Sequence, residues 1–216
     1  MGDKMIIKVE HLTKRFGTTV VLDDVSVNFK EGRIHGIIGR NGSGKTMLMK
    51  CICGFSCASK GAVTVAKKIV GKDVEIPDDI GVIIETPGFV TNYSGYKNLK
   101  LLASVRNKIS DEDIVDVMKR VGLDPKSKKH VGKYSLGMRQ RLGIAQAIME
   151  NPKILVLDEP MNGLDNDGVQ DMRKLFLSLK GQGKTILIAS HNREDIDMLC
   201  DCVYEMDKGR LICKNY

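Results

Sequence analysis

A glycine-rich segment of eight residues is the part of the chain whose residue types and spacing most clearly predict chemistry. It reads Gly39-Arg40-Asn41-Gly42-Ser43-Gly44-Lys45-Thr46, which has the phosphate-loop spacing of Gly, four residues and Gly-Lys-Thr. Backbone N–H groups in such a turn converge on phosphate oxygens, and the helix that follows adds its dipole. Lys45 is expected to reach the β- and γ-phosphates, and the Thr46 hydroxyl to bind Mg²⁺. The segment therefore predicts a nucleoside triphosphate site.

A pair of carboxylates forms the second candidate. Asp158 and Glu159 directly follow the apolar run 154–157, which is typical of a buried strand. Ligands of open α/β sheets bind beyond the carboxyl ends of the strands. We therefore expect Asp158 to hold Mg²⁺, usually through water, and Glu159 to activate the attacking water as general base. An Asp-Glu pair alone would more simply begin a helix, but the phosphate loop favours the functional interpretation.

The elements that must position these groups alternate between strand and helix. Strands are expected at 6–10, 20–29, 34–38, 62–66, 80–84, 153–158, 185–190, 201–206 and 210–213, and helices at 47–52, 167–180 and 192–200. From about Gly88 to Glu150 the apolar spacing becomes helical. These patterns predict one α/β domain over 1–216, in which 1–87 and 151–216 form the core and 88–150 a helical insert in a mostly parallel sheet.

Composition limits the class of protein. Of the 216 residues 42% are hydrophobic, and 34 basic against 27 acidic residues give a net charge of +7. No run approaches the roughly 20 apolar residues that span a bilayer, and the N-terminus lacks the apolar core of a signal peptide. A cytosolic protein is expected. A basic protein could dock near anionic lipids, whereas nucleic acid is not expected, because no stripe of aromatic and basic residues occurs.

Six cysteines require an interpretation, and no Cys-x-x-Cys pair occurs among them. We expect all six to be reduced and mostly buried thiols, with a metal or redox site as the alternative. They are Cys51, Cys53, Cys57, Cys200, Cys202 and Cys213.

A helix is expected to begin in the segment Tyr134-Ser135-Leu136-Gly137-Met138-Arg139-Gln140-Arg141. Alone, Ser135 would be an ordinary N-cap. In the company of the motifs above, the segment resembles the Leu-Ser-Gly-Gly-Gln signature of the ATP-binding subunits of ABC (ATP-binding cassette) transporters. Ser135 and Gly137 match the signature, whereas Leu136 and Met138 depart from it in a way that resembles one exporter branch.

Three further segments resemble family motifs in the family's order. Asn162-Gly163-Leu164-Asp165 resembles the D-loop, which contacts the facing subunit. His191 resembles the switch histidine, which contacts the γ-phosphate or orients water, and Phe16 resembles the aromatic residue that stacks on adenine. The alternatives are a turn before a helix, a structural histidine at a strand end and a small core phenylalanine.

One departure from the family is informative. Where most members have glutamine before the helical insert, this chain has Glu85. A carboxylate cannot donate a hydrogen bond, but it ligates Mg²⁺ more strongly than an amide oxygen. With glutamate at this position, the chain resembles the ATPases of antimicrobial-peptide exporters, which form the lantibiotic and bacitracin self-immunity group.

The resemblance implies a phosphate-loop ABC ATPase fold with an antiparallel β subdomain and a helical subdomain. It implies ATP and Mg²⁺ as cofactors, and an ATP sandwich in which Lys45 of one copy faces Ser135 of the other. It also implies a separate integral membrane permease, so that the subunit lies peripherally on the inner face of the membrane. The expected catalytic residues are Glu159, His191 and Lys45. The expected metal ligands are Thr46, Glu85 and Asp158, and ATP is expected to contact Phe16, 39–46, Ser135, Gly137 and Asp165.

Two other functions stay open at this point: a non-transport ABC ATPase that acts on ribosomes or DNA, and an inactive nucleotide-binding scaffold. The aromatic residues Phe89, Tyr93 and Tyr96 also leave two interpretations. They either anchor the core of the insert or line a groove for a cytoplasmic helix of the permease.

Overall fold

The computed structural model describes residues 4–214, and a six-stranded sheet forms its centre. The strand order is β10-β9-β3-β8-β7-β6. All neighbouring pairs are parallel except β9 and β10. These strands are β3 (Ile34–Ile38), β6 (Ile80–Ile83), β7 (Ile154–Asp158), β8 (Thr185–Ala189), β9 (Cys202–Asp207) and β10 (Arg210–Lys214). The apolar runs in β3, β7 and β8 are buried nearly throughout, as expected for parallel strands covered on both faces.

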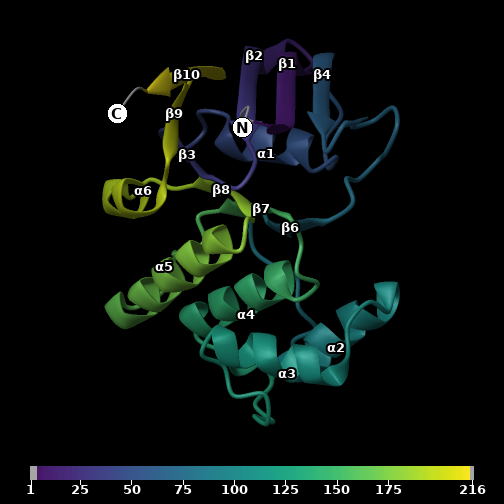
Figure 1. The fold of residues 1–216 in the computed structure, drawn as a ribbon, viewed down its shortest axis with the longest axis vertical. Helices are drawn as coiled ribbons and strands as arrows, with labels where there is room; N and C mark the ends of the chain where they lie inside the picture. The colour runs from purple at the N-terminus through teal and green to yellow at the C-terminus, as the bar shows by residue number, and fades with distance from the viewer. Residues whose placement is uncertain (1–3, 215–216) are drawn as a thin grey trace.

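A second, antiparallel sheet has the order β2-β1-β4-β5. Its strands are β1 (Met5–Phe16), β2 (Thr19–Lys30), β4 (Lys60–Val65) and β5 (Lys68–Ile69). The predicted strand 6–10 is thus too short, because β1 continues through register shifts and a left-handed backbone at His11 (φ 49°) that periodicity does not reveal. The antiparallel β subdomain is confirmed, and Figure 1 shows it at one end of the molecule.

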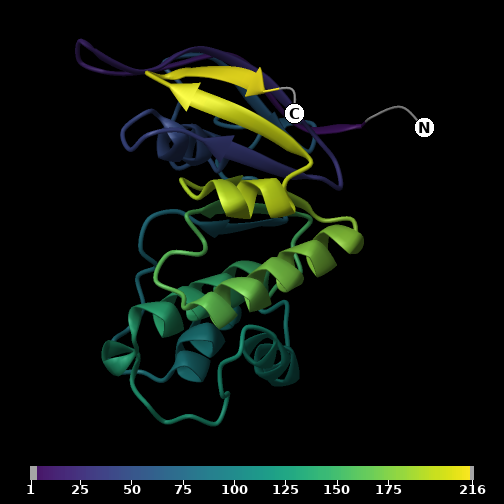
Figure 2. The same ribbon diagram turned by 90° about the vertical axis from the view of Figure 1, so that its left-hand side faces the viewer.

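The two faces of the central sheet pack against different elements. Ile154 and Val156 of β7 belong to the core that includes α1 (Lys45–Ile52) and the antiparallel sheet. Leu155 and Leu157 belong to the core that includes α4 (Leu136–Ile148) and α5 (Asn166–Gly181). Figure 2 shows α5 beside the helical part of the molecule, away from the antiparallel sheet. This alternation follows from the two-residue period of a strand.

The helical subdomain consists of α2 (Gly95–Arg106), α3 (Asp111–Arg120), the 3-10 turn η1 (Val131–Lys133) and α4. α3 begins with a capping box, in which Ser110 and Asp113 each satisfy the other's backbone N–H. The helices begin only at Gly95, so 88–94 is irregular rather than helical. Phe89 and Tyr96 pack against the core of this subdomain. That packing favours the core interpretation for these two aromatic residues.

The last helix, α6 (Arg193–Leu199), is held to α5 by a buried ion pair. The Arg173 guanidinium donates to Asp195 from Nε at 2.9 Å and from Nη2 at 2.6 Å. Both side chains are almost fully buried, so removal of Arg173 would leave the Asp195 carboxylate buried without its cation, whereas Arg173 is also paired with Glu194 at 3.0 Å. In residues 4–214, no helix is both long and apolar enough to cross a membrane.

The cysteines are all free thiols, as predicted, but their burial is more varied. Cys51 and Cys53 are buried, and burial raises the pKa of their thiols to about 11 and about 12. Cys57 and Cys213 are exposed. The expectation of mostly buried thiols is therefore wrong for these two, because one lies in the surface segment after α1 and the other on the edge strand β10.

Candidate nucleotide-binding and hydrolysis site

The phosphate loop connects β3 to α1, as the sequence predicts. α1 begins at Lys45, so the last two residues of the motif form its first turn. Gly39 has φ 152°, and a Cβ there would lie 2.3 Å from the carbonyl oxygen of Met206. Glycine is therefore required at this position both for backbone conformation and for close packing against β9.

Lys45 is folded over the loop that precedes it. Its Nζ donates to the carbonyl oxygens of Gly39 at 2.6 Å and Arg40 at 3.1 Å, and the residue is only 6% exposed. The Ser43 hydroxyl is also buried and has no hydrogen-bond partner in the described part of the chain. A buried cation and an unsatisfied hydroxyl in one loop fit a site that receives an anionic oxygen ligand such as phosphate.

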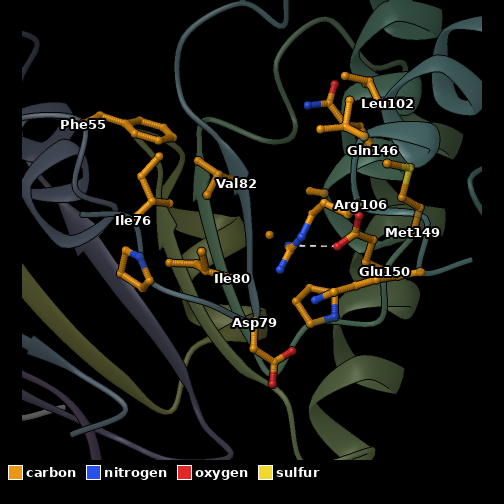
Figure 3. A pocket seen from close by; sticks show the side chains of 16 residues that line it. Phe55, Ile76, Asp79, Ile80, Val82, Leu102, Arg106, Gln146, Met149 and Glu150 are labelled. Carbon is orange, nitrogen blue, oxygen red and sulfur yellow. Dashed lines mark ion pairs between the residues drawn. The ribbon is translucent and has the colours of Figure 1, made fainter. Parts of the chain in front are cut away.

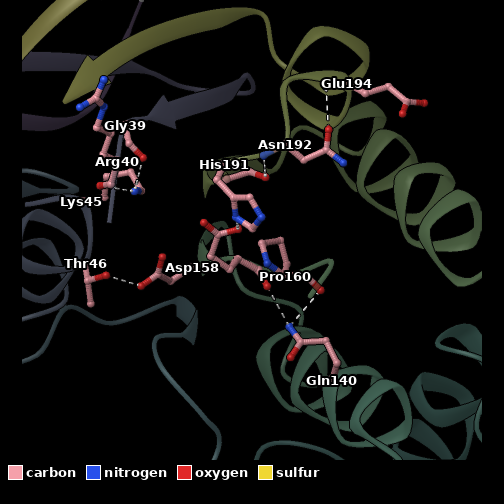
Figure 4. Close-up of polar contacts among 12 residues, drawn as sticks. Gly39, Arg40, Lys45, Thr46, Gln140, Asp158, Pro160, His191, Asn192 and Glu194 are labelled. Atoms are coloured by element: carbon pink, nitrogen blue, oxygen red, sulfur yellow. Dashed lines mark hydrogen bonds and ion pairs between the residues drawn. The ribbon is translucent and has the colours of Figure 1, made fainter. Parts of the chain in front are cut away.

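Thr46 and Asp158 meet across the ends of α1 and β7. The Thr46 hydroxyl donates to Oδ2 of Asp158 at 2.6 Å. Burial raises the pKa of Asp158, the bond from Thr46 opposes that shift, and the neighbouring Glu159 charge adds to it. Together, this hydroxyl and this carboxylate offer oxygen ligands of the kind that a hard cation such as Mg²⁺ prefers. A bound cation would also stabilise the carboxylate charge that burial disfavours. Figure 4 shows this pair next to Lys45.

Glu159 has a strained backbone that is held by a backbone hydrogen bond, and its side chain contacts a histidine. Its φ is 49°, in the left-handed region, and its N–H donates to Ala189 at 2.9 Å. Oε2 of its side chain lies 2.9 Å from Nδ1 of His191, which follows the neighbouring strand β8. Glu159 is 21% exposed and His191 63%, so the pair is open to solvent on one side. A positioned carboxylate at a partly open edge suits a general base, and backbone strain is frequent at such sites.

The loop of His191 is fixed by a short series of caps. The Ser190 hydroxyl accepts from the N–H of Asn192 at 3.1 Å, and the Asn192 side chain accepts from the N–H of Glu194 at 2.9 Å. These bonds, visible in Figure 4, begin α6 immediately after the histidine.

Glu85 shares a cavity of about 460 Å³, here called the nucleotide cavity, with Thr46, Asp158 and Glu159. Its carboxylate is paired with Lys50 of α1, with Nζ 2.5 Å from Oε1. The predicted metal ligand therefore lies at the site, but its charge is matched by a lysine that the sequence analysis did not single out. No sequence signal connects these two residues, because they are 35 positions apart.

The signature residues line a different cavity, of about 740 Å³, here called the signature cavity. It is lined by Ser135, Gly137 and Asp165 among others. Ser135 caps α4 by accepting from the N–H of Met138 at 3.2 Å, and Asp165 caps α5 by accepting from Gly168 at 2.9 Å. The N-cap interpretation of Ser135 and that of a turn before a helix at 162–165 are thus both correct. They do not exclude ligand binding, because a capped helix N-terminus still presents N–H groups.

Not all predicted site residues come together within one copy of the chain. Lys45 and Ser135 line separate cavities. Phe16 lies at the end of β1, is 54% exposed, and has Lys14 Nζ 4.8 Å from its ring centre. Its high exposure excludes the alternative of a core phenylalanine. Stacking on adenine stays a prediction for this residue.

Gln140 is a second residue at the site, after Lys50, to which the sequence analysis assigned no role. Nε2 of Gln140 in α4 donates to the backbone oxygens of Glu159 and Pro160, at 3.3 Å and 2.9 Å. The sequence shows only that Gln140 lies in the signature segment. Its contact with carbonyl groups of another segment cannot be predicted from residue spacing.

Comparison with known proteins agrees with this geometry. The family model described as "ABC transporter" matches residues 22–162. The chain is 45% identical to the ABC transporter ATP-binding protein YybJ of Bacillus subtilis, over 95% of this chain and 94% of that protein. It is 39% identical to the bacitracin transport ATP-binding protein BcrA of Enterococcus faecalis, over 96% of this chain and 68% of that protein.

The fold agrees as well. A crystal structure of a nucleotide-free ATP-binding cassette from an ABC transporter superposes with a TM-score of 0.83 and 27% sequence identity, covering 97% of this chain and 90% of that one. The predicted fold class is therefore confirmed. The chain belongs to the ABC transporter family, as its ATP-binding and ATP-hydrolysing subunit.

Proposed function

We propose that this subunit powers an ABC exporter of antimicrobial peptides or similar amphiphiles. The observation that carries the ATPase part is the convergence of Lys45, Asp158, Glu159 and His191 at one edge of the sheet. The substrate class rests on two supports: the 39% identity to a bacitracin transport ATP-binding protein, and Glu85 where most of the family has glutamine. No observation favours the alternative of an ATPase that acts on ribosomes or DNA.

The residues of the site have separate roles in ATP hydrolysis. The ammonium of Lys45 leaves the carbonyls of Gly39 and Arg40 to neutralise phosphate charge. Glu159 accepts a proton from the attacking water, and His191 holds its carboxylate in place. Thr46, Asp158 and Glu85 would hold Mg²⁺, which offsets charge on the phosphates when bound. The nearly intact site disfavours an inactive scaffold.

A second copy is needed to complete the site. Within one copy, the phosphate loop and the signature residues line separate cavities. Two copies packed head to tail would place Ser135 of one against the phosphates bound at Lys45 of the other. The helix α4, here called the signature helix because Ser135 caps it, would then direct the positive end of its dipole at the phosphates.

A groove between the core and the helical subdomain is the proposed docking site for the permease. It has a volume of about 370 Å³ and is lined by residues of β6, α2 and α4. Phe55, Ile76 and Val105 lie along it and are 53%, 54% and 79% exposed. Figure 3 shows Phe55 and Ile76 on one side, and Leu102 and Met149 on the other. Charged residues also line the groove, namely Asp79, Lys108 and the ion pair of Arg106 with Glu150. Apolar anchors beside charged groups suit a short cytoplasmic helix of a separate membrane protein.

The position of this groove links it to the site. β6 supplies Ile80 and Val82 to the groove and leads directly to Glu85. The apolar groove also argues for peripheral attachment to the inner face of the membrane, through the permease rather than through lipid. Phe89, Tyr93 and Tyr96 are absent from its lining, so this proposal rests on Phe55, Ile76 and Val105, and a docking role for Tyr93 or Tyr96 stays a separate prediction.

The decisive experiment measures phosphate release by the purified chain with MgATP, alone and with its permease in proteoliposomes. Hydrolysis that is stimulated by an antimicrobial peptide such as bacitracin supports the full proposal. Hydrolysis that no peptide stimulates would contradict the substrate class. An absence of hydrolysis under both conditions would contradict the ATPase assignment of these residues.

A further inference from the structure

Gln140 connects the signature helix to the segment that carries the general base. Its amide Nε2 donates to the carbonyl oxygens of Pro160 at 2.9 Å and Glu159 at 3.3 Å. Figure 4 shows the side chain reaching from α4 toward both carbonyls. A carboxamide has two N–H donors on one nitrogen, so it can serve two adjacent carbonyls at once. Gln140 is partly buried, which limits the competition from water.

The same two segments meet at a second point, three to four residues closer to the start of α4, at Leu136 and Gly137. A Cβ placed on Gly163 would lie 2.4 Å from Cγ of Leu136, and one on Gly137 would lie 2.8 Å from the carbonyl oxygen of Gly163. Gly163 also has φ +77°, which other residues rarely adopt. The signature segment therefore contacts both ends of the turn that follows Glu159, with Gln140 at Glu159 and Pro160 and with Leu136 and Gly137 at Gly163.

These contacts fix the backbone of Glu159 from both sides. Its N–H donates to the carbonyl oxygen of Ala189 in β8, and its own carbonyl accepts from Nε2 of Gln140 and, at 3.2 Å, from the N–H of Asn162. A residue with φ 49° keeps that conformation only if its surroundings hold it. The Asn162 bond lies within the same turn, so loss of Gln140 would remove the hold of α4 on that turn and allow the Glu159 carboxylate to shift relative to the attacking water.

We propose that Gln140 is a positioning residue, which fixes the general base Glu159 to the signature helix. The inference rests on the proposed two-copy arrangement, in which α4 faces the nucleotide of the other copy. Engagement of Ser135 with that nucleotide moves α4, and Gln140 transmits the movement to Glu159 of its own site. One side chain thus links the two nucleotide sites of the pair.

Two substitutions at this position separate hydrogen bonding from packing. Gln140→Glu keeps the shape of the side chain but replaces the donor with an acceptor, which faces two carbonyl oxygens. Gln140→Lys keeps donors that reach the same carbonyls. Gln182→Glu is the matched control, because it makes the same charge change at an exposed position after α5.

The measurements are kcat and KM for ATP, nucleotide affinity and the melting temperature of each variant. We expect Gln140→Glu to lower kcat by about tenfold or more, because small displacements of a catalytic group are costly. KM, nucleotide affinity and melting temperature should stay near the parent values. Gln140→Lys should retain more activity than Gln140→Glu, and Gln182→Glu should match the parent. The Hill coefficient for ATP should lie above 1 in the parent and nearer 1 in Gln140→Glu.

The outcomes distinguish this inference from the proposed function. If the parent hydrolyses ATP and Gln140→Glu does so equally fast, the positioning role is wrong while the ATPase assignment stands. A fall in nucleotide affinity and melting temperature that accounts for the lost activity would make Gln140 merely structural. Equal Hill coefficients in the parent and in Gln140→Glu would exclude transmission between sites. If the parent itself hydrolyses no ATP, the proposed function fails first.

Discussion

Nδ1 of His191 lies 2.9 Å from Oε2 of Glu159, across the ends of the neighbouring strands β8 and β7. The two residues are 32 positions apart in the chain, yet the parallel pairing of Asp158 with Ala189 brings them side by side. The histidine therefore orients the carboxylate of Glu159 within the fold itself. On the proposed assignment, this arrangement separates water activation, at Glu159, from phosphate binding, at Lys45.

That separation gives the first prediction. Glu159→Gln should lower the rate of ATP hydrolysis by about 10²-fold or more, because the amide cannot accept the proton of water. ATP binding should be retained, and an ATP-bound dimer should accumulate in size-exclusion chromatography. Lys45→Ala is the contrasting variant and should lose tight MgATP binding. Hydrolysis by Glu159→Gln at the parent rate would show that another group is the base.

The second prediction concerns the ion pair of Glu85 with Lys50. If the carboxylate serves the metal site, Glu85→Gln should raise the Mg²⁺ concentration for half-maximal activity by about threefold to tenfold. Lys50→Gln should shift it in the opposite direction, because the lysine competes for the carboxylate. ATPase rate and ATP-analogue affinity, each measured against Mg²⁺ concentration, test both variants. Curves that coincide with the parent for Glu85→Gln and Glu85→Ala would place Glu85 outside the metal site.

The third prediction concerns the groove. Val105→Glu introduces a charge at a side chain that is 79% exposed in the isolated subunit, so folding and ATP hydrolysis should be unaffected. Association with the permease should weaken by about tenfold, because an apolar contact is replaced by a desolvated charge. Leu177→Glu is the control, since Leu177 is also an exposed apolar helical residue, on α5 and outside the groove lining. Co-purification of the permease with each variant measures the effect, and equal recovery with Val105→Glu and the parent would contradict docking there.

The fourth prediction concerns pH and stability. His35 is fully buried between Phe29 and Tyr204, its Nε2 lies 2.9 Å from the carbonyl oxygen of Lys30, and burial lowers its pKa below 6.5. Below pH 6.5 the unfolded chain therefore binds more protons at this residue than the folded chain does. The free energy of unfolding should fall as pH drops from 6.5 toward the lowered pKa, with a slope of at most about 1.4 kcal/mol per pH unit from this group.

The comparison of variants isolates this group. His35→Phe should remove that part of the pH dependence, whereas the exposed His130→Asn should not. Denaturant unfolding of the parent and both variants at pH 7.5 and pH 5.5 gives the slopes. If His35→Phe and the parent lose the same stability over this interval, His35 is not the titrating group.

Local residue patterns determined the elements and most of the candidate site. The phosphate loop was predictable because its glycines, Lys45 and Thr46 act through a short backbone turn. Asp158 and Glu159 were predictable because ligands collect at the carboxyl ends of parallel strands, whereas His191 was predicted from its resemblance to the family's switch histidine. The resemblance to ABC transporter subunits placed the antiparallel subdomain and the signature helix. The length of β1 was underestimated, because bulges interrupt the two-residue period on which the prediction rests.

Only the tertiary structure decided which side chains contact each other across segments. The pairing of Glu85 with Lys50, the contact of Gln140 with the carbonyls of Glu159 and Pro160, and the burial of His35 all join residues from different elements. The groove between β6, α2 and α4 likewise exists only after two subdomains have packed. The physical reason is that periodicity and turn chemistry act within a few residues, whereas these contacts depend on the relative placement of whole elements through the shared core.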